Sequence, residues 1–192
     1  KDPAPVLPIL EKLKNDPTDY VRRSVANNLN DISKDHPELV LRIAKKWLGH
    51  TAETDWVVKH ALRGLLKQGN TEALVLFGFG SPDKIEVQNL EITTPKVTIG
   101  KDLFFNFEIH NKDTKASKLR IEYAIDFVKK TGKTSKKVFK ITENNYTPGI
   151  TKMERKQSFK DFSTRKHYPG KHQLEILVNG VVKASQGFDV EG

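Results

Sequence analysis

The chain has 192 residues and a formal net charge of +9, with 33 lysines and arginines against 24 aspartates and glutamates. This length allows one large domain or two small ones, each with its own core. The absence of cysteine excludes a disulfide framework and thiolate metal sites, and no apolar run approaches the roughly 18 residues of a membrane span. The basic balance favours a polyanionic partner, with nucleic acid ahead of an acidic membrane surface.

The excess of positive charge is unevenly distributed along the chain. Residues 1–80 hold 12 lysines and arginines against 10 acidic residues, a net charge of +2. Residues 81–192 hold 21 against 14, a net charge of +7. The second part therefore carries most of the excess, although lysines that only keep a surface soluble would give the same totals.

Residues 1–82 are patterned for helices joined by short turns. Apolar spacing, prolines in first turns and polar caps predict helices over residues 5–15, 18–33, 37–48, 54–69 and 71–79, the last of them capped by Thr71. Shifting the chain by 36 residues lays Asp19-Tyr20-Val21 over Asp55-Trp56-Val57, so an acidic, aromatic, apolar order recurs. A period in the high thirties predicts HEAT-like repeats, in which paired helices stack into a curved α solenoid.

Two stripes of polar residues lie on the second helix of each predicted pair, at the spacing of three or four that places them on one face. They consist of Arg23, Asn27, Asn30 and Lys34 on one helix and Lys59, Arg63 and Lys67 on the other. Cations and amides of this kind bond phosphate oxygens and sugars, so the concave surface of the solenoid is a predicted phosphate-binding surface. The alternative is a solvated face that Asp31 and Asp35 neutralise.

Residues 83–192 change to the alternating pattern of β-strands. Seven stretches of strand character, separated by turn signals, cover residues 84–93, 103–111, 118–128, 136–142, 155–162, 172–180 and 181–190. Asn179-Gly180 is a strong hairpin signal. Seven strands in about 110 residues predict an immunoglobulin-like sandwich. The expected fold class is therefore multidomain, α then β, with HEAT-like helical repeats over residues 1–82 and a β-sandwich over residues 83–192.

A lysine-rich turn joins two of the predicted strands. Its run "KKTGKTSKKVFK" holds Lys129, Lys130, Lys133, Lys136, Lys137 and Lys140. Lysine is an adaptable point charge, so this hairpin suits phosphate contact and would let the sandwich clamp duplex DNA. The alternative is a charged edge that prevents strand-to-strand aggregation. The sequence does not show whether a second basic group faces the same way as this turn. That group consists of Arg155, Lys156, Arg165, Lys166 and Lys171.

Two segments of the helical half carry a family resemblance. "YVRRSVANNLNDISKDHP" (residues 20–37) and "TDWVVKHALRGLLKQGN" (residues 54–70) resemble the DNA alkylation repair protein family of HEAT-like DNA glycosylases. The sequence looks most like the AlkC branch, in which an immunoglobulin-like domain follows the helical repeats. The resemblance covers nearly the whole chain, but its specific motifs lie between Asp16 and Phe79, and the strand-rich half matches by architecture alone.

The resemblance implies a monofunctional DNA-3-methyladenine glycosylase that binds double-stranded DNA with alkylated bases and hydrolyses the N-glycosidic bond of cationic alkylpurines. It implies no metal, no dissociable cofactor and no membrane, and a monomer in the bacterial cytoplasm beside the nucleoid. A carboxylate would stabilise the oxocarbenium-like sugar and place a water, and a tryptophan would attract the cationic base by a cation–π interaction.

Matching positions in this sequence supply the candidate residues. Trp56 is the candidate lesion-facing aromatic, with helix packing as the alternative. Asp31 and Asp55 are the candidate catalytic carboxylates. Asp55 could instead cap a helix, and Asp31 could pair with Arg63 or Lys34. The predicted DNA-binding residues are Arg22, Arg23, Asn27, Asn30, Lys59, Arg63, Lys67, Lys133, Lys136 and Lys137.

A non-catalytic interaction module that binds nucleic acid or protein is the rival interpretation. A carboxylate and an aromatic ring that converge on one surface would favour the enzyme, because a scaffold does not need the pair. The chain begins at Lys1 and its only methionine is Met153, so we expect a truncated or processed chain whose upstream repeats carry part of the site. Such a piece is expected to bind DNA weakly and to lack catalysis.

Overall fold

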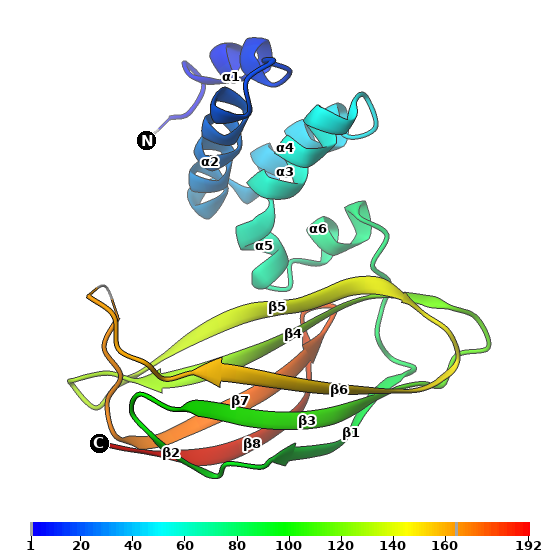
Figure 1. The fold of residues 1–192 in the computed structure, drawn as a ribbon. Helices are drawn as coiled ribbons and strands as arrows, with labels where there is room; N and C mark the ends of the chain where they lie inside the picture. The colour runs from blue at the N-terminus through cyan, green and yellow to red at the C-terminus, as the bar shows by residue number, and fades with distance from the viewer. Residues whose placement is uncertain (1, 164) are drawn as a thin grey trace. The chain divides into compact units, whose positions relative to one another are not determined.

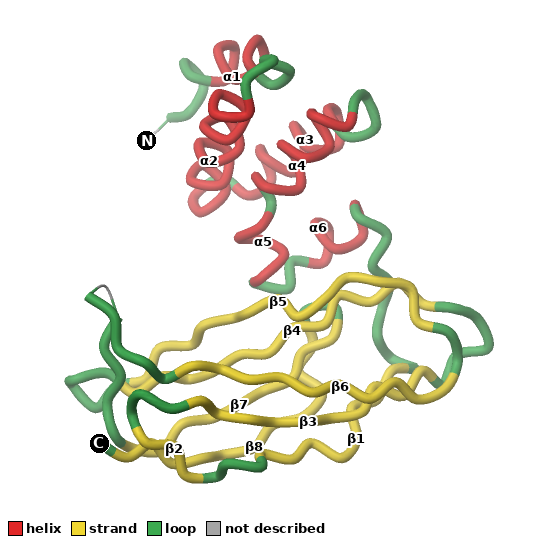
Figure 2. Tube along the Cα trace, viewed as in Figure 1, coloured by secondary structure: helices red, strands yellow, loops and turns green. Residues whose placement is uncertain are grey.

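The computed structural model describes residues 2–163 and 165–192, and the chain divides into two compact units, Lys1–Phe77 and Gly78–Gly192 (Figure 1). Figure 2 shows that helices form the first unit and that strands dominate the second. Within the described residues, no helix is both long enough and apolar enough to cross a membrane.

The first unit, which we call the helical unit, is built around α2. Its helices are α1 (Leu7–Leu13), α2 (Asp19–Asp35), α3 (Pro37–Trp47), α4 (Ala52–Ala61), α5 (Arg63–Lys67) and α6 (Thr71–Leu76). α2 packs against α1, α3, α4 and α5. Val25 and Leu29 of α2, Trp47 of α3 and Val57 of α4 are at most 2% exposed, so an apolar core holds these helices together.

Side-chain caps set where α4 and α6 begin. The Thr51 hydroxyl accepts a hydrogen bond from the Thr54 amide at 3.1 Å, and Asn70 Oδ1 accepts one from the Ala73 amide at 2.9 Å. Both bonds satisfy amides that the first helical turn leaves without a backbone partner. The prediction that Thr71 caps the last helix was therefore wrong, because Asn70 takes that place.

The predicted α solenoid was also wrong. The described helices are few and short, the strands hold more residues than the helices, and the chain is mainly a two-sheet β structure. The helix expected over residues 54–69 is interrupted at Leu62, and α5 then continues for only 5 residues. Gly64 in α5 is a poor helix former, which weakens the helix at this point. The spacing of 36 residues therefore relates only α2 to α4 and α5, and one related pair cannot form a solenoid, which needs about three repeats.

The second unit, which we call the sandwich, consists of two sheets. Its strands are β1 (Ile85–Ile92), β2 (Lys96–Thr98), β3 (Asp102–Asn111), β4 (Ser117–Val128), β5 (Thr134–Tyr146), β6 (Gly149–Ser158), β7 (Gly170–Val178) and β8 (Val181–Glu191). One sheet has the order β1-β3-β6 and the other β2-β8-β7-β4-β5, and β2 pairs with β8 in parallel. Figure 1 shows the sheets as two layers. Inward side chains such as Phe105, Phe107, Ile121 and Leu174 form the core between them.

The hairpin predicted at Asn179-Gly180 is confirmed. Asn179 and Gly180 have φ of 47° and 78°, as a type I′ turn requires, and Val178 pairs with Val181. The strand β2 was not predicted, because three residues are too few for alternation to be detected. The strand expected at residues 155–162 runs instead over β6, an edge strand whose mostly exposed side chains gave little apolar alternation.

Asn179 also fixes the segment that leads into β1. Its Nδ2 donates to the Gly80 carbonyl at 2.8 Å, while its Oδ1 accepts a hydrogen bond from the Arg120 amide at 2.7 Å. Phe79 is 2% exposed, and Lys118 Nζ lies 5.1 Å from its ring centroid. These contacts make the segment after Phe77 part of the sandwich.

A buried ion cluster lies between β4 and β5. Arg120 Nη2 donates to Glu122 Oε1 at 2.6 Å, and Arg120 Nη1 pairs with Glu143, its partner in the strand register. The side chains of Arg120 and Glu122 are 5% and 0% exposed. Because a buried charge without its partner is costly, this cluster stabilises the register of β4 against β5.

Candidate nucleic-acid interface

Five residues from α2, α4 and α5 form a polar and aromatic group, which we call the helical cluster: Arg23, Asn27, Trp56, His60 and Arg63. Trp56 and His60 are four residues apart on α4, so they share one face of the helix. Their rings stack with centroids 4.9 Å apart and 9° between the planes. Arg23 Cζ lies 5.6 Å from the Trp56 ring centroid, which is a cation–π distance.

The Asn27 side-chain oxygen holds two members of the helical cluster in place. Arg63 Nη2 donates to Asn27 Oδ1 at 3.0 Å, and Arg63 Nη1 donates to the His60 carbonyl at 2.6 Å. His60 Nε2 lies 3.2 Å from the same Oδ1. Because a carbonyl oxygen only accepts, the His60 imidazole donates from Nε2. The two bonds of Arg63 fix the direction of its guanidinium.

The helical cluster, together with the Asp19 carboxylate that contacts it, has a net positive charge from Arg23 and Arg63. Arg23 Nη2 donates to Asp19 Oδ2 at 2.9 Å, and this bond lowers the pKa of Asp19 and keeps the carboxylate charged. Burial lowers the pKa of His60, as do the charges of Arg63 and Arg23, so the imidazole is neutral at neutral pH. A phosphate group placed here would meet the guanidinium groups of Arg23 and Arg63.

Four predicted site residues meet in the helical cluster: Arg23, Asn27, Trp56 and Arg63. Two residues that contact them, His60 and Asp19, were not predicted as site residues. His60 belongs to the cluster, and its spacing of four from Trp56 was the signal that could have found it. Asp19 pairs with Arg23, again at a spacing of four. The sequence pattern contained both pairs, but it could not show that α2 and α4 would pack with these faces together.

Two predicted DNA-binding residues have structural contacts instead of a place in the helical cluster. Asn30 is buried, and its Oδ1 accepts a hydrogen bond from the Gly64 amide at 3.2 Å, which joins α2 to α5. Arg22 Nη1 donates to the carbonyls of Asp16 and Pro17 at 2.7 Å and 2.9 Å, which fixes the turn before α2. These contacts occupy the Asn30 side-chain oxygen and the Nη1 group of Arg22, and both residues stay predicted DNA ligands.

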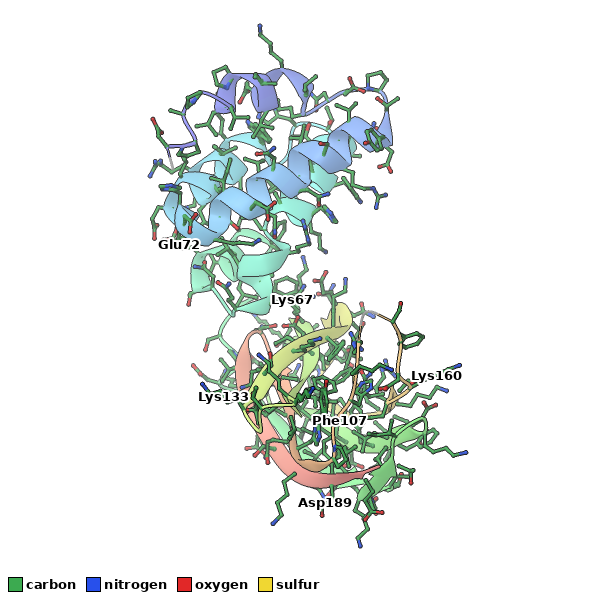
Figure 3. The ribbon with its side chains drawn as sticks, turned by 90° about the vertical axis from the view of Figure 1, so that its left-hand side faces the viewer. Lys67, Glu72, Phe107, Lys133, Lys160 and Asp189 are labelled. Carbon is green, nitrogen blue, oxygen red and sulfur yellow. The ribbon has the colours of Figure 1, made fainter. Side chains whose placement is uncertain are left out.

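Lys59 and Lys67 are exposed lysines of the helical unit. Lys59 Nζ lies 6.0 Å from the Phe77 ring centroid. Lys67 is in the last turn of α5 and is labelled in Figure 3. An exposed lysine is an adaptable point charge, so both residues stay predicted phosphate ligands.

The predicted catalytic carboxylates each contact a group other than Trp56. Asp31 Oδ1 accepts a hydrogen bond from Lys34 at 2.7 Å, and this bond, with a weaker effect of Arg63, lowers the pKa of Asp31. Asp55 accepts a hydrogen bond from the Gly49 amide at 2.6 Å. The pair with Lys34 is one of the alternatives that the sequence left open for Asp31. Asp55 does not cap α4, because Thr51 is the cap and Asp55 bonds the Gly49 amide before the helix.

The second candidate surface is one end of the sandwich, which we call the basic end. It comprises the turn between β4 and β5, the start of β5 and the loop between β6 and β7, with Lys129, Lys130, Lys133, Lys137, Lys160, Arg165 and Lys166. The Lys129 amide donates to the Lys133 carbonyl at 2.8 Å and closes the turn. Figure 3 looks onto this end and shows Lys133 and Lys160 pointing outward on two sides of it.

Three packing contacts place the turn and the loop at the same end. Gly170, where the loop ends, lies against Val128, where β4 ends. The Phe127 ring is 5.7 Å from the ring of Phe159, where the loop begins, and Lys137 Nζ lies 5.9 Å from the Phe127 ring. Both segments therefore bring positive charge to the same end of the sandwich.

The three predicted lysines of the turn differ in their surroundings. Lys136 Nζ lies 2.6 Å from Glu175 on β7, so its charge is neutralised within the sandwich. Lys133 is exposed in the turn, and Lys137 covers the Phe127 ring. Cross-strand pairing, which the sequence does not display, decides which lysine is neutralised.

The family of the chain follows from its strand-rich half. The model of the family described as "Uncharacterised protein YhaZ, C-terminal Ig-like domain" matches residues 86–192. The chain belongs to the YhaZ family. The immunoglobulin-like domain expected in this half is thereby confirmed. YhaZ from Bacillus subtilis (strain 168) is 53% identical to the chain over 190 residues, which cover 98% of the chain and 53% of YhaZ.

The whole length of this member of the YhaZ family is similar to part of a solved structure. That structure is the Pseudomonas fluorescens alkylpurine DNA glycosylase AlkC bound to DNA containing an abasic site analog, with a TM-score of 0.94 and 41% identity. The match covers 100% of the chain and 54% of AlkC. The predicted resemblance to the AlkC branch is confirmed, and the chain spans about half the length of both relatives.

Proposed function

We propose that this chain binds double-stranded DNA as part of a DNA repair protein of the alkylpurine DNA glycosylase type. One observation carries the proposal: two cationic surfaces, the helical cluster and the basic end, occur in a chain similar over its whole length to a DNA-bound glycosylase. Arginine and lysine contacts to phosphates supply the sequence-independent part of the affinity of proteins for DNA.

The helical cluster suits a phosphate group in geometry as well as in charge. A guanidinium has five N–H donors, so the bonds of Arg63 to Asn27 and to the His60 carbonyl leave others for a phosphate oxygen. Because these bonds already fix the guanidinium, little side-chain entropy is lost when a phosphate binds. Arg23, over the Trp56 ring, supplies a second guanidinium, whose charge Asp19 partly offsets.

We extend the proposal to the longer proteins of this family. They act as monomers at the bacterial nucleoid on alkylated duplex DNA and hydrolyse the N-glycosidic bond of cationic alkylpurines such as 3-methyladenine. The methylated base already carries a positive charge, so the reaction needs a carboxylate to stabilise the sugar cation and place a water. Asp31 and Asp55 are the candidates within this chain, with Trp56 as an aromatic wall.

The contacts of these candidates favour a second function for the chain by itself, DNA binding without catalysis. Asp31 pairs with Lys34, and Asp55 accepts a bond from the Gly49 amide. His60 and Arg23 cover part of the Trp56 ring. The expected mark of an enzyme was a carboxylate that converges with an aromatic ring, whereas the contacts of Asp31 and Asp55 are to Lys34 and Gly49. In this second function the catalytic groups belong to the rest of the longer protein.

Base release separates the two functions. The full-length protein that contains this chain is incubated with duplex DNA carrying 3-methyladenine, and Asp31→Asn and Asp55→Asn are compared with Asp35→Asn, an exposed control on α2. A catalytic carboxylate predicts that release falls by about a hundredfold or more while DNA binding is retained. Unchanged release in both variants would assign DNA binding, without catalysis, to the chain.

A further inference from the structure

One loop of the basic end carries an exposed aromatic ring among cations. Phe162 is 54% exposed, and Lys160 and Arg165 lie within three residues of it. Lys166 lies in the same loop, but its Nζ pairs with Asp161 at 3.2 Å. A single exposed apolar side chain is ordinary in proteins. An exposed ring in a loop that also carries Lys160 and Arg165 suits contact with bases, because the cations can hold the neighbouring phosphates.

Backbone pairing and buried neighbours hold Phe162 in this position. The Phe162 amide donates to the Arg165 carbonyl at 2.8 Å, and the Arg165 amide donates to the Phe162 carbonyl at 3.1 Å. Phe159 is fully buried, and its ring lies 5.0 Å from that of His167. The Asp161 carboxylate accepts a hydrogen bond from the His167 amide at 2.9 Å. The loop is anchored on both sides of Phe162, so a contact made by its ring costs little ordering entropy.

The chemistry of this surface favours DNA over a membrane as the partner of Phe162. An anionic bilayer would also attract a ring among lysines, but stable anchoring needs more buried apolar surface than one phenylalanine provides. One aromatic ring stacked on a base contributes a measurable share of nucleic-acid affinity. The lysine turn between β4 and β5 lies at the same end and extends the cationic surface along which a phosphate backbone could run.

We propose that Phe162 is a DNA-contacting residue that stacks on an opened base step of duplex DNA, with Lys160 and Arg165 on the flanking phosphates. This inference rests on the proposed DNA-binding function and adds a base contact to it. Phe162 contributes affinity that is insensitive to salt, whereas the cations contribute the salt-dependent part.

The test compares Phe162→Ala and Phe162→Trp with the unaltered chain on duplex DNA that contains 2-aminopurine. Phe104→Ala is the matched control, because Phe104 is also exposed but lies on β3. Phe162→Ala is expected to weaken binding by about fivefold or more, the loss of one stacking contact, with the same salt dependence. Binding of the unaltered chain is expected to change the 2-aminopurine fluorescence, and Phe162→Ala removes this change. Phe162→Trp and Phe104→Ala are expected to keep both the affinity and the fluorescence change. Circular dichroism melting confirms that each variant is folded.

Three outcomes would overturn the inference. They also distinguish a failure of the Phe162 base contact from a failure of the proposed DNA binding. Equal binding by Phe162→Ala and the unaltered chain, while Lys133→Glu weakens binding, rejects the base contact but keeps DNA binding. No duplex binding by any of these proteins rejects both. Loss of binding by Phe162→Ala to phosphatidylserine vesicles, with DNA binding unchanged, makes the ring a membrane contact instead.

Discussion

The helical cluster and the basic end hold positive charge in different ways. In the helical cluster, hydrogen bonds to Asn27 and Asp19 fix the guanidinium groups of Arg63 and Arg23. At the basic end, lysines such as Lys133 extend from a turn and a loop. A fixed guanidinium binds phosphate in a set direction, whereas a flexible lysine adapts to any direction. The helical cluster is therefore suited to position DNA, and the basic end to add salt-dependent affinity.

The largest expected effect concerns the scaffold that presents the basic end. Arg120→Ala leaves Glu122 buried without its partner, so we expect the sandwich to lose about 3–5 kcal/mol of unfolding free energy. Urea denaturation measures the loss, with Lys140→Ala, an exposed lysine of β5, as the control. An Arg120→Ala sandwich as stable as the control would show that the buried ion cluster does not hold the register of β4 and β5.

The next effect distinguishes a fixed guanidinium from a flexible ammonium. Arg63→Lys keeps the charge but loses the forked bonds to Asn27 and the His60 carbonyl, so we expect duplex affinity to fall by about tenfold. The reverse change at the basic end, Lys133→Arg, is expected to leave affinity unchanged. Titration of a labelled duplex measures both. Equal effects of the two substitutions would remove the distinction between the two surfaces.

A smaller effect is expected in the salt dependence of binding. Lys133→Ala together with Lys137→Ala removes two phosphate contacts, so the slope of log affinity against log salt concentration should become shallower by about 2. Lys136→Ala is the matched control, because Glu175 already neutralises Lys136. A slope that changes as much in the control as in the double variant would argue against the basic end as a phosphate-binding surface.

The smallest effect is a loss of stability in acid, expected in both units. Burial is the main cause that lowers the pKa of His60 in the helical unit and of His167 and His172 in the sandwich. The unfolded chain binds protons at a higher pH than the folded chain, so stability is complete above the ordinary histidine pKa and is lost as pH falls through the lowered values. We expect the melting temperature to fall by a few degrees between about pH 7 and about pH 5.

Single substitutions assign this acid effect to the two units. His60→Gln and His172→Gln should each remove part of the loss, because glutamine does not titrate. Thermal melting followed by circular dichroism at several pH values measures it. A melting temperature that rises as the pH falls would contradict the lowered pKa values of these histidines.

The strand-rich half was easier to predict from the sequence than the helical half. Alternation is a local signal, and Asn179-Gly180 encodes its own turn because both residues tolerate positive φ. The solenoid failed because a spacing of 36 residues shows that two helices are alike, while stacking depends on helix lengths that Leu62 and Gly64 interrupt.

The candidate site could be predicted only in part, because neutralising partners come from distant parts of the chain. Arg23, Asn27 and Arg63 were found from helical spacing. The buried contact of Asn30 with Gly64 spans 34 residues, and the pair of Lys136 with Glu175 joins β5 to β7. No local pattern shows such pairs. Exposure of a loop ring such as Phe162 also depends on how the rest of the loop is anchored.

The most direct test of DNA binding by the two surfaces is fluorescence anisotropy of a labelled DNA duplex, titrated with the chain over a series of salt concentrations. The unaltered chain is compared with a variant that carries Arg63→Ala and Lys133→Ala, one change on each surface. We predict binding that weakens steeply with salt, and weaker binding with a shallower slope in the variant. No binding at low salt, or identical binding curves for the two proteins, would contradict a role for these surfaces in DNA binding.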